Sequence, residues 1–203
     1  MALAPPPLPS TRKAARGIWI YASAAILFFF AIVLAVVCFG VFTNSTGGMA
    51  PAIEPHDQIL VLRVAYWIRP PARGDIAIFR TGKIPLLATG KDEIYVKRVA
   101  GLPGERVSIA NGALLINGRP VPLRNKNGEI HYSGSPISVG GFDGHGPLLE
   151  GDEITVPPKS YFLLGDNTKS SYDSRMFGCV PAASLRGRVL RCLAPAKNAG
   201  PMQ

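Results

Sequence analysis

One lysine in an apolar stretch is the residue of this sequence that is best suited to take part in a reaction. Lys97 lies in the run Tyr95–Val99, whose β-branched and aromatic residues predict a strand. On a strand, Tyr95, Lys97 and Val99 share one face, and Arg98 points to the opposite face. A lysine acts as a general base only when it is neutral, so its pKa of about 10.4 must be lowered by apolar burial. The flanking residues are therefore compatible with a desolvated lysine that accepts a proton.

Four segments carry residues that could take part in catalysis, and each segment has an ordinary structural interpretation when it is taken alone. A Gly-Met-x-Pro stretch is usually a linker, Arg-Gly-Asp and Gly-Asp-Asn are common turns, and a strand lysine is usually solvated. Asp-Ser-Arg is equally an ordinary surface ion pair. It is their joint presence and order that carry information. In chain order the segments are Thr46–Ile53 with Asp57 after it, Arg73–Phe79, Tyr95–Val107 and Gly165–Gly178.

Short strands must position these segments. From about residue 44 onward, short apolar runs alternate with Gly, Pro and Asn, and none is long enough for a well-defined helix. Asn111-Gly112 and Asn117-Gly118 predict hairpin turns. We therefore expect a β domain over 44–195, with a Gly-rich insert at about 124–151 that forms a loop or small lobe. The expected strands are Gln58–Val64, Asp75–Phe79, Ile94–Val99, Arg106–Ile109, Ala113–Ile116, Glu153–Val156, Tyr161–Leu164 and Arg188–Leu193.

The N-terminal part has a different texture. Residues 1–16 are rich in proline and then basic, which predicts a disordered tail. Residues 17–42 contain no charge, and as a helix they would span about 39 Å, more than the ~30 Å hydrocarbon core. A cleaved signal peptide is the alternative, but its apolar region is usually only ~7–15 residues long. We therefore predict an uncleaved transmembrane anchor over 17–43, with Trp19 and Tyr21 at an interface.

Charge then sets the expected topology. Arg12, Lys13 and Arg16 precede the anchor, so the positive-inside rule places the N-terminus in the cytoplasm. The localisation expected is a single-pass protein of the plasma (inner) membrane with an extracytoplasmic C-terminal domain. Residues 196–203 are expected to be a disordered tail.

Composition excludes several classes of function. The 203 residues carry a net charge of +9, with a sequence pI of about 9.8. The basic residues are scattered and no nucleic-acid motif is present, so nucleic acid is not an expected partner. The three cysteines and three histidines follow no metal-ligand spacing, and no metal site is expected. Cys179 and Cys192 are expected to be packing residues, with a disulfide between them as the alternative.

Together and in this order, the four segments resemble the bacterial type I signal peptidases, over roughly residues 46–181. The resemblance implies a mainly β fold behind one N-terminal transmembrane helix, with a large hydrophobic surface near the membrane. It implies cleavage of signal peptides from exported preproteins after small residues at the third-last and last signal positions. It also implies a Ser/Lys dyad that needs no metal or cofactor, and the lipid bilayer and the preproteins as partners.

The resemblance also assigns roles to individual residues. Lys97 matches the general base, and Tyr95 flanks it. Ser171 matches a serine that hydrogen-bonds and orients the lysine amine. Thr46 matches a hydroxyl-bearing position of the oxyanion hole, together with the backbone N–H of Gly48. Asp173 and Arg175 match an ion pair that braces the Ser171 segment, and Gly165, Asp166 and Asn167 form the turn beneath it.

The sequence departs from the family at one position, because Gly48 stands where the family has its attacking serine. The family's spacing is kept by the residues that follow, which are Met49, Pro51, Ile53 and Asp57. The alignment of Gly48 with the family's serine therefore cannot easily be shifted by a residue. Three explanations are open. The first is that the chain is a signal peptidase whose serine was altered, naturally or by engineering, and whose scaffold still binds precursors. The second is that Ser45 or Thr46 supplies the nucleophile, and the third is that the chain is a non-catalytic homologue. The presence of Lys97, Ser171 and Asp173 argues against long drift from catalysis.

Two functions therefore follow as hypotheses. The first is a signal-peptidase-type serine endopeptidase whose activity in this chain is limited by Gly48. The second is a membrane-anchored homologue that binds preproteins or pilin-like subunits during surface assembly. Processing peptidases of conjugative transfer systems share the dyad, but the Lys-Arg-Val-Ala-Gly-Leu-Pro-Gly and Gly-Asp-Asn segments favour the general signal peptidases.

Overall fold

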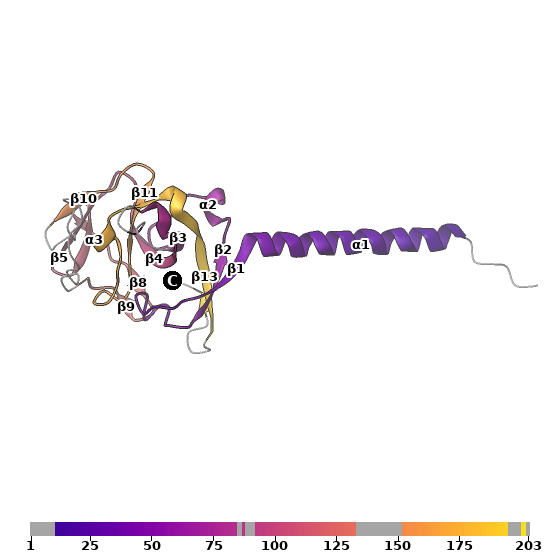
Figure 1. Ribbon diagram of the computed structural model, residues 1–203, viewed down its shortest axis with the longest axis horizontal. Coiled ribbons are helices and arrows are strands. Elements are labelled where there is room, and N and C mark those ends of the chain that lie inside the picture. The colour runs from indigo at the N-terminus through magenta and orange to yellow at the C-terminus, as the bar shows by residue number, and fades with distance from the viewer. Residues whose placement is uncertain (1–10, 85–86, 88–91, 133–151, 195–199, 202–203) are drawn as a thin grey trace, which may run out of the picture. The chain divides into compact units, whose positions relative to one another are not determined.

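The computed structural model describes residues 11–84, 87, 92–132, 152–194 and 200–201. The chain divides into two compact units, Met1–Cys38 and Phe39–Gln203. The first ten residues of the expected tail, residues 133–151 of the expected insert and most of the expected C-terminal tail lie outside the described residues. The fold class predicted from the sequence is confirmed, since one N-terminal apolar helix precedes a mainly β unit (Figure 1).

The first unit contains a single helix, α1 (Thr11–Cys38), of 28 residues. Its segment Trp19–Cys38 has 20 residues with a mean hydropathy of 2.7, which is long and apolar enough to cross a membrane. The helix begins six residues before the expected start of the anchor. Alanine, arginine and lysine dominate those residues and are good helix formers, so the basic part of the expected tail is helical.

The other end of the expected anchor also differs from the structure. Phe39–Thr43 does not continue the helix but forms strand β1, paired antiparallel with β2 (Gln58–Leu62). A β-carbon on Gly40 would lie only 2.6 Å from the side chain of Arg63, so glycine permits this close packing. The apolar pattern extends through both elements because lipid and a sheet select similar residues.

The second unit is built on an eight-stranded antiparallel sheet with the order β1-β2-β13-β3-β4-β11-β12, in which β14 pairs with β13. The central strands β3 and β4 are buried over most of their length, so the middle of the sheet belongs to the core. The remaining strands of this sheet are β3 (Ile76–Arg80), β4 (Ile94–Gly101), β11 (Ser160–Leu164), β12 (Val180–Pro181), β13 (Leu185–Ala194) and β14 (Gly200–Pro201).

A smaller sheet with the order β10-β5-β6-β7 packs beside the first through a shared apolar cluster that includes Val107, Val156 and Phe162. Its turns have the predicted chemistry, since Asn111 and Gly112 both adopt positive φ (50° and 75°). The strands are β5 (Arg106–Ala110), β6 (Ala113–Ile116), β7 (Arg119–Pro120) and β10 (Glu153–Thr155), and β8 (Arg124–Asn125) pairs separately with β9 (Gly128–Glu129).

Four short helices connect these strands, and they make up the rest of the described elements. They are α2 (Ala65–Ile68), α3 (Ser174–Phe177) and the 3₁₀ helices η1 (Thr81–Lys83) and η2 (Ala182–Ser184). Cys179 and Cys192 are not joined by a disulfide, in agreement with the expectation that they are packing residues.

Candidate functional site

The loop that carries Gly48 is anchored from below by apolar side chains. Met49 and Ile53 are fully buried and pack on the sheet against Ile59 and Ile78. Two turn hydrogen bonds fold the loop back, from the Ala50 N–H to the Gly47 carbonyl (3.0 Å) and from the Ile53 N–H to the Met49 carbonyl (3.0 Å). Gly48 is itself buried and is therefore held in one place above the sheet.

Lys97 lies in the middle of β4, where it pairs with Ala77 of β3. Its side chain is buried, and its Nζ lies 5.7 Å from the centroid of the Tyr95 ring. Burial lowers the pKa of Lys97 from its ordinary value. The nearby carboxylates of Asp173 and Asp166 raise that pKa in part, and the Arg175 guanidinium lowers it again. A buried amine with a lowered pKa is what a general base requires.

The segment that follows β11 brings a third side chain to the same place. The Asp173 carboxylate accepts hydrogen bonds from the Gly165 N–H (2.9 Å) and from the Arg175 guanidinium (2.9 Å). Asp173 and Arg175 are both buried, so this ion pair fixes the loop between them and Gly165. Ser171 sits in that loop and points towards Gly48.

The three segments converge on the position that a side chain at residue 48 would occupy. A β-carbon built on Gly48 would lie 3.2 Å from Lys97 Nζ, 3.5 Å from Ser171 Oγ and 3.7 Å from the Ser170 carbonyl oxygen. Gly48 does not have the positive φ that other side chains avoid. A serine at this position would therefore place its oxygen within reach of the lysine amine.

One expected contact is not formed. Among the described residues, Ser171 Oγ has no hydrogen-bond partner, although the atom is buried. The sequence-based expectation of a hydrogen bond from Ser171 to Lys97 therefore differs from the structure. Both side chains nevertheless lie close to the Gly48 position.

Asn167 joins the two loops directly. Its backbone N–H donates to the Gly48 carbonyl (3.2 Å), and its side-chain amide donates to the Gly47 carbonyl (3.0 Å). Gly165 makes this approach possible, because a β-carbon there would lie 2.5 Å from the Gly48 carbonyl oxygen. Sequence reasoning placed Asn167 in a turn but missed this contact, for which only the Asn residue type gave a signal.

A buried ion pair on the opposite face of β4 was also missed. Arg98 donates to both carboxylate oxygens of Asp166, at 2.8 and 2.6 Å, and both side chains are almost fully buried. This bidentate pair ties the turn after β11 to the strand that carries Lys97. The alternation along β4 predicted that Arg98 faces away from Lys97, but not that it finds a carboxylate there.

The expected oxyanion donors are less fully defined. Thr46 is exposed, and its backbone carbonyl accepts a hydrogen bond from the Asn44 side chain (2.7 Å). Within the described part of the chain, no group accepts a hydrogen bond from the Gly48 N–H.

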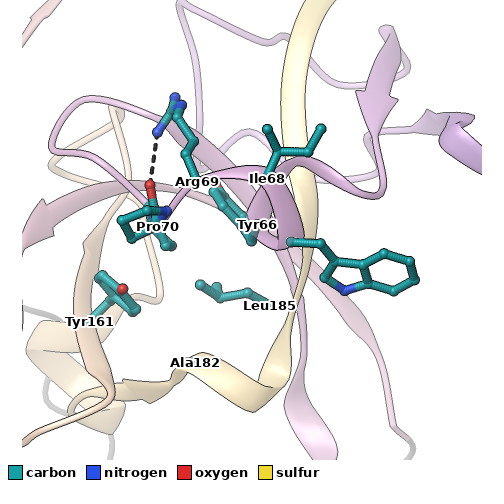
Figure 2. A pocket seen from close by; sticks show the side chains of 9 residues that line it. Tyr66, Ile68, Arg69, Pro70, Tyr161, Ala182 and Leu185 are labelled. Carbon is teal, nitrogen blue, oxygen red and sulfur yellow. Dashed lines mark hydrogen bonds between the residues drawn. The ribbon is translucent and has the colours of Figure 1, made fainter.

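A separate pocket of about 370 Å³ lies between α2 and η2 (Figure 2). Two of its lining residues, Trp67 and Ile68, are strongly exposed, at 84% and 74%. None of its lining residues belongs to the group around Gly48. They are Tyr66, Trp67, Ile68, Arg69, Pro70, Pro71, Tyr161, Ala182 and Leu185.

A buried lysine that lies close to Gly48 and Ser171 is compatible with the Ser/Lys site expected from the sequence, and comparison with known proteins identifies the class. The family described as signal peptidase, peptidase S26 matches residues 17–193. The chain belongs to this family of serine endopeptidases, whose members cleave signal peptides.

Individual relatives agree with this assignment. The chain is 35% identical to signal peptidase I of Leptolyngbya laminosa over 153 residues, which cover 75% of this chain and 67% of the relative. It is 37% identical to signal peptidase I of Bacillus caldolyticus over 149 residues, covering 70% and 71%. A solved signal peptidase I from Enterococcus faecalis V583 is 28% identical and covers 59% of this chain and 97% of that one, with a TM-score of 0.38, so the assignment rests on sequence.

Proposed function

We propose that this chain is a signal-peptidase scaffold that binds exported preproteins at a membrane surface and lacks only the attacking oxygen of its dyad. The observation that carries the proposal is the 3.2 Å between Lys97 Nζ and the β-carbon position of Gly48. The burial of Lys97, a Gly48 N–H without a partner among the described residues, and the ion pair of Asp173 with Arg175 support this proposal.

The chemistry of the complete dyad follows from these positions. With serine at residue 48, neutral Lys97 would take the hydroxyl proton as the oxygen attacks the scissile carbonyl carbon. The backbone N–H of residue 48 and the Thr46 hydroxyl would stabilise the oxyanion. The lysine ammonium would then protonate the leaving amine, and water would hydrolyse the acyl-enzyme. Loss of the nucleophilic serine typically lowers kcat by roughly 10⁶-fold, so we expect the unmodified chain to cleave very slowly.

The test compares the full chain with its Gly48→Ser variant in detergent, using a preprotein with alanine at the third-last and last signal positions. We expect the variant to cleave at least ~10³-fold faster than the unmodified chain. Its rate should rise with pH and level off below the ordinary pKa of lysine, because burial lowers the pKa of Lys97. Gly48→Ala is the matched control, since it adds the β-carbon without the oxygen and should stay inactive.

Two other outcomes would contradict the proposal. If the unmodified chain cleaves as fast as the variant, Ser45 or Thr46 supplies the nucleophile, which Ser45→Ala and Thr46→Val would then reveal. If the folded Gly48→Ser variant binds the preprotein but does not cleave it, the chain is a binding homologue that has lost more than its serine.

The membrane context is part of the same proposal. Trp19–Cys38 would span the bilayer with the basic residues of α1 in the cytoplasm and the β unit outside. Phe39, the first residue after the span, pairs with Leu62, and α2 with its exposed Trp67 begins three residues later. The test is a C-terminal fusion to a reporter enzyme that works only outside the plasma membrane. We expect this fusion to be active, and an inactive fusion would overturn the proposed orientation.

A further inference from the structure

The position beside Gly48 is surrounded by polar groups. Around the point that a β-carbon would occupy lie an amine, a hydroxyl and a backbone carbonyl, from Lys97, Ser171 and Ser170, at 3.2, 3.5 and 3.7 Å. Gly48 and Lys97 are buried, so bulk solvent does not dominate this point. A small polar molecule needs two to four hydrogen-bonding partners in such a place, and three are present.

The hydrogen-bonding capacity of these groups is only partly used. Ser171 Oγ is buried and has no partner among the described residues, which is a costly arrangement unless another molecule completes it. A hydroxyl compound at this point can accept from Ser171 and donate to Lys97 Nζ or to the Ser170 carbonyl. The site therefore suits a molecule that both donates and accepts.

Size restricts the molecule further. A β-carbon is bonded to Cα, whereas an untethered atom must stay about 3.5 Å from it, so a bound molecule would lie further from the backbone than the β-carbon position does. Methanol has the carbon and oxygen of a serine side chain without the bond to the backbone. A branched alcohol has further carbons, which would lie closer to the side chains of Lys97 and Ser171.

We propose that Gly48 converts the nucleophile position into an acceptor site for a small exogenous hydroxyl compound, water or an alcohol of the size of methanol, which attacks the scissile carbonyl directly. The proposal rests on the proposed function, because it requires that the chain bind preproteins with the scissile bond at Gly48. It adds an activity, alcoholysis of the signal peptide, that proceeds without an acyl-enzyme.

The reaction is balanced by groups at the site. The hydroxyl oxygen forms a bond to the scissile carbonyl carbon while its proton passes to neutral Lys97. The tetrahedral oxyanion faces the Gly48 N–H and then collapses, and the C–N bond breaks. The Lys97 ammonium gives its proton to the leaving nitrogen and returns to the neutral form. Methanol yields a signal-peptide methyl ester and water yields the free acid, each with a mature protein that carries a new amino terminus.

The experiment uses the full chain in detergent with the same preprotein and increasing methanol. We expect the rate at which mature protein is released to rise saturably with methanol concentration, by about tenfold or more over the rate without methanol. Mass spectrometry should show a released signal peptide that is heavier than the free acid by one methylene group. The rate should stay far below that of Gly48→Ser, because tethering a nucleophile is worth an effective concentration of about 10⁵ M or more.

Matched variants separate this acceptor site from a solvent effect. Gly48→Ala places a methyl group where methanol would bind and should abolish both the acceleration and the ester. Lys97→Met should abolish them as well, because no base remains, and 2-propanol should not replace methanol. Ester formed equally by the Gly48→Ala variant would overturn the proposal.

The failures of the two proposals are distinguishable. If Gly48→Ser cleaves but methanol neither accelerates the unmodified chain nor appears in its product, the acceptor site is refuted and the proposed function stands. If Gly48→Ser fails to cleave the bound preprotein, the proposed function falls and the acceptor site with it.

Discussion

The contact between the two loops at Gly165 makes a sharp prediction about a single methyl group. A β-carbon on Gly165 would lie 2.5 Å from both the Gly48 carbonyl oxygen and Ser171 Cβ, and closer still to Ser171 Oγ. Nonbonded atoms pack at about 3.5–4.0 Å, so Gly165→Ala must push the loops apart by about 1 Å or more. That displacement would stretch the 3.2 Å hydrogen bond from Asn167 to Gly48 beyond useful length.

The expected magnitudes follow from this displacement. Overpacking of a buried contact costs about 1–3 kcal/mol, and a misplacement of ~1 Å at a reacting atom can cost ~10²-fold in rate. In the Gly48→Ser background, Gly165→Ala should therefore lower kcat/KM by about two orders of magnitude. The melting temperature should fall at the same time.

The assay pairs preprotein cleavage with thermal unfolding. Ser171→Gly removes two of the three closest atoms, so adding it to Gly165→Ala should restore part of the lost melting temperature, while the clash with the Gly48 carbonyl remains. Gly47→Ala is the stability control, because its β-carbon would meet nothing nearer than 3.9 Å. If Gly165→Ala leaves both stability and cleavage unchanged, the loops do not meet as described.

Three further changes test other parts of the structure. Burial lowers the pKa of Lys97, so the unfolded chain holds a proton that the folded chain releases, and stability rises with pH between that lowered pKa and the ordinary lysine value. Lys97→Met should thus raise the melting temperature at neutral pH by an amount that shrinks towards the ordinary lysine pKa, whereas a pH-independent gain would refute this cause. His56 has a φ of 67°, a conformation that costs about 1–2 kcal/mol for a residue other than glycine. His56→Gly should raise the free energy of unfolding by about 1 kcal/mol, measured by denaturant titration, and His56→Ala should not. The sequence has two tryptophans, so in a Trp19→Phe variant Trp67 is the only source of tryptophan fluorescence. We expect brominated phospholipids to quench it in proteoliposomes, whereas quenching by aqueous iodide alone would show that α2 does not touch lipid.

Most strands were predictable because their signals are local. The run Ala113–Ile116 forms β6 with the predicted bounds, and Asn-Gly pairs close both hairpins because asparagine and glycine accept positive φ. The end of α1 was not predictable in this way. Phe39–Thr43 is as apolar as the helix before it, and only pairing with β2, which is distant in sequence, makes it a strand.

The same contrast between local signals and contacts distant in sequence applies to the candidate site. Alternation along a strand was enough to predict that Lys97 is buried and that Arg98 faces away from it. The partners across the fold were not encoded locally, so the Arg98–Asp166 pair and the grip of Asn167 on Gly48 were missed. The expected bond between Ser171 and Lys97 was wrong for a related reason, since a motif gives proximity but not direction.

The position of Arg98 next to Lys97 also makes the site sensitive to strand register. If β4 slipped by one residue, every side chain would change face, and Arg98 would be directed at Gly48 while Lys97 met Asp166. An arginine stays protonated in proteins, so a slipped strand would present a cation that cannot act as a base. The bidentate fit of Arg98 to Asp166 favours the correct pairing, since a lysine cannot reproduce it. The ion pair on the opposite face of β4 thus favours the register that also directs Lys97 at Gly48. A molecule with a shifted β4 would lose the Arg98–Asp166 pair and the lysine beside Gly48 together.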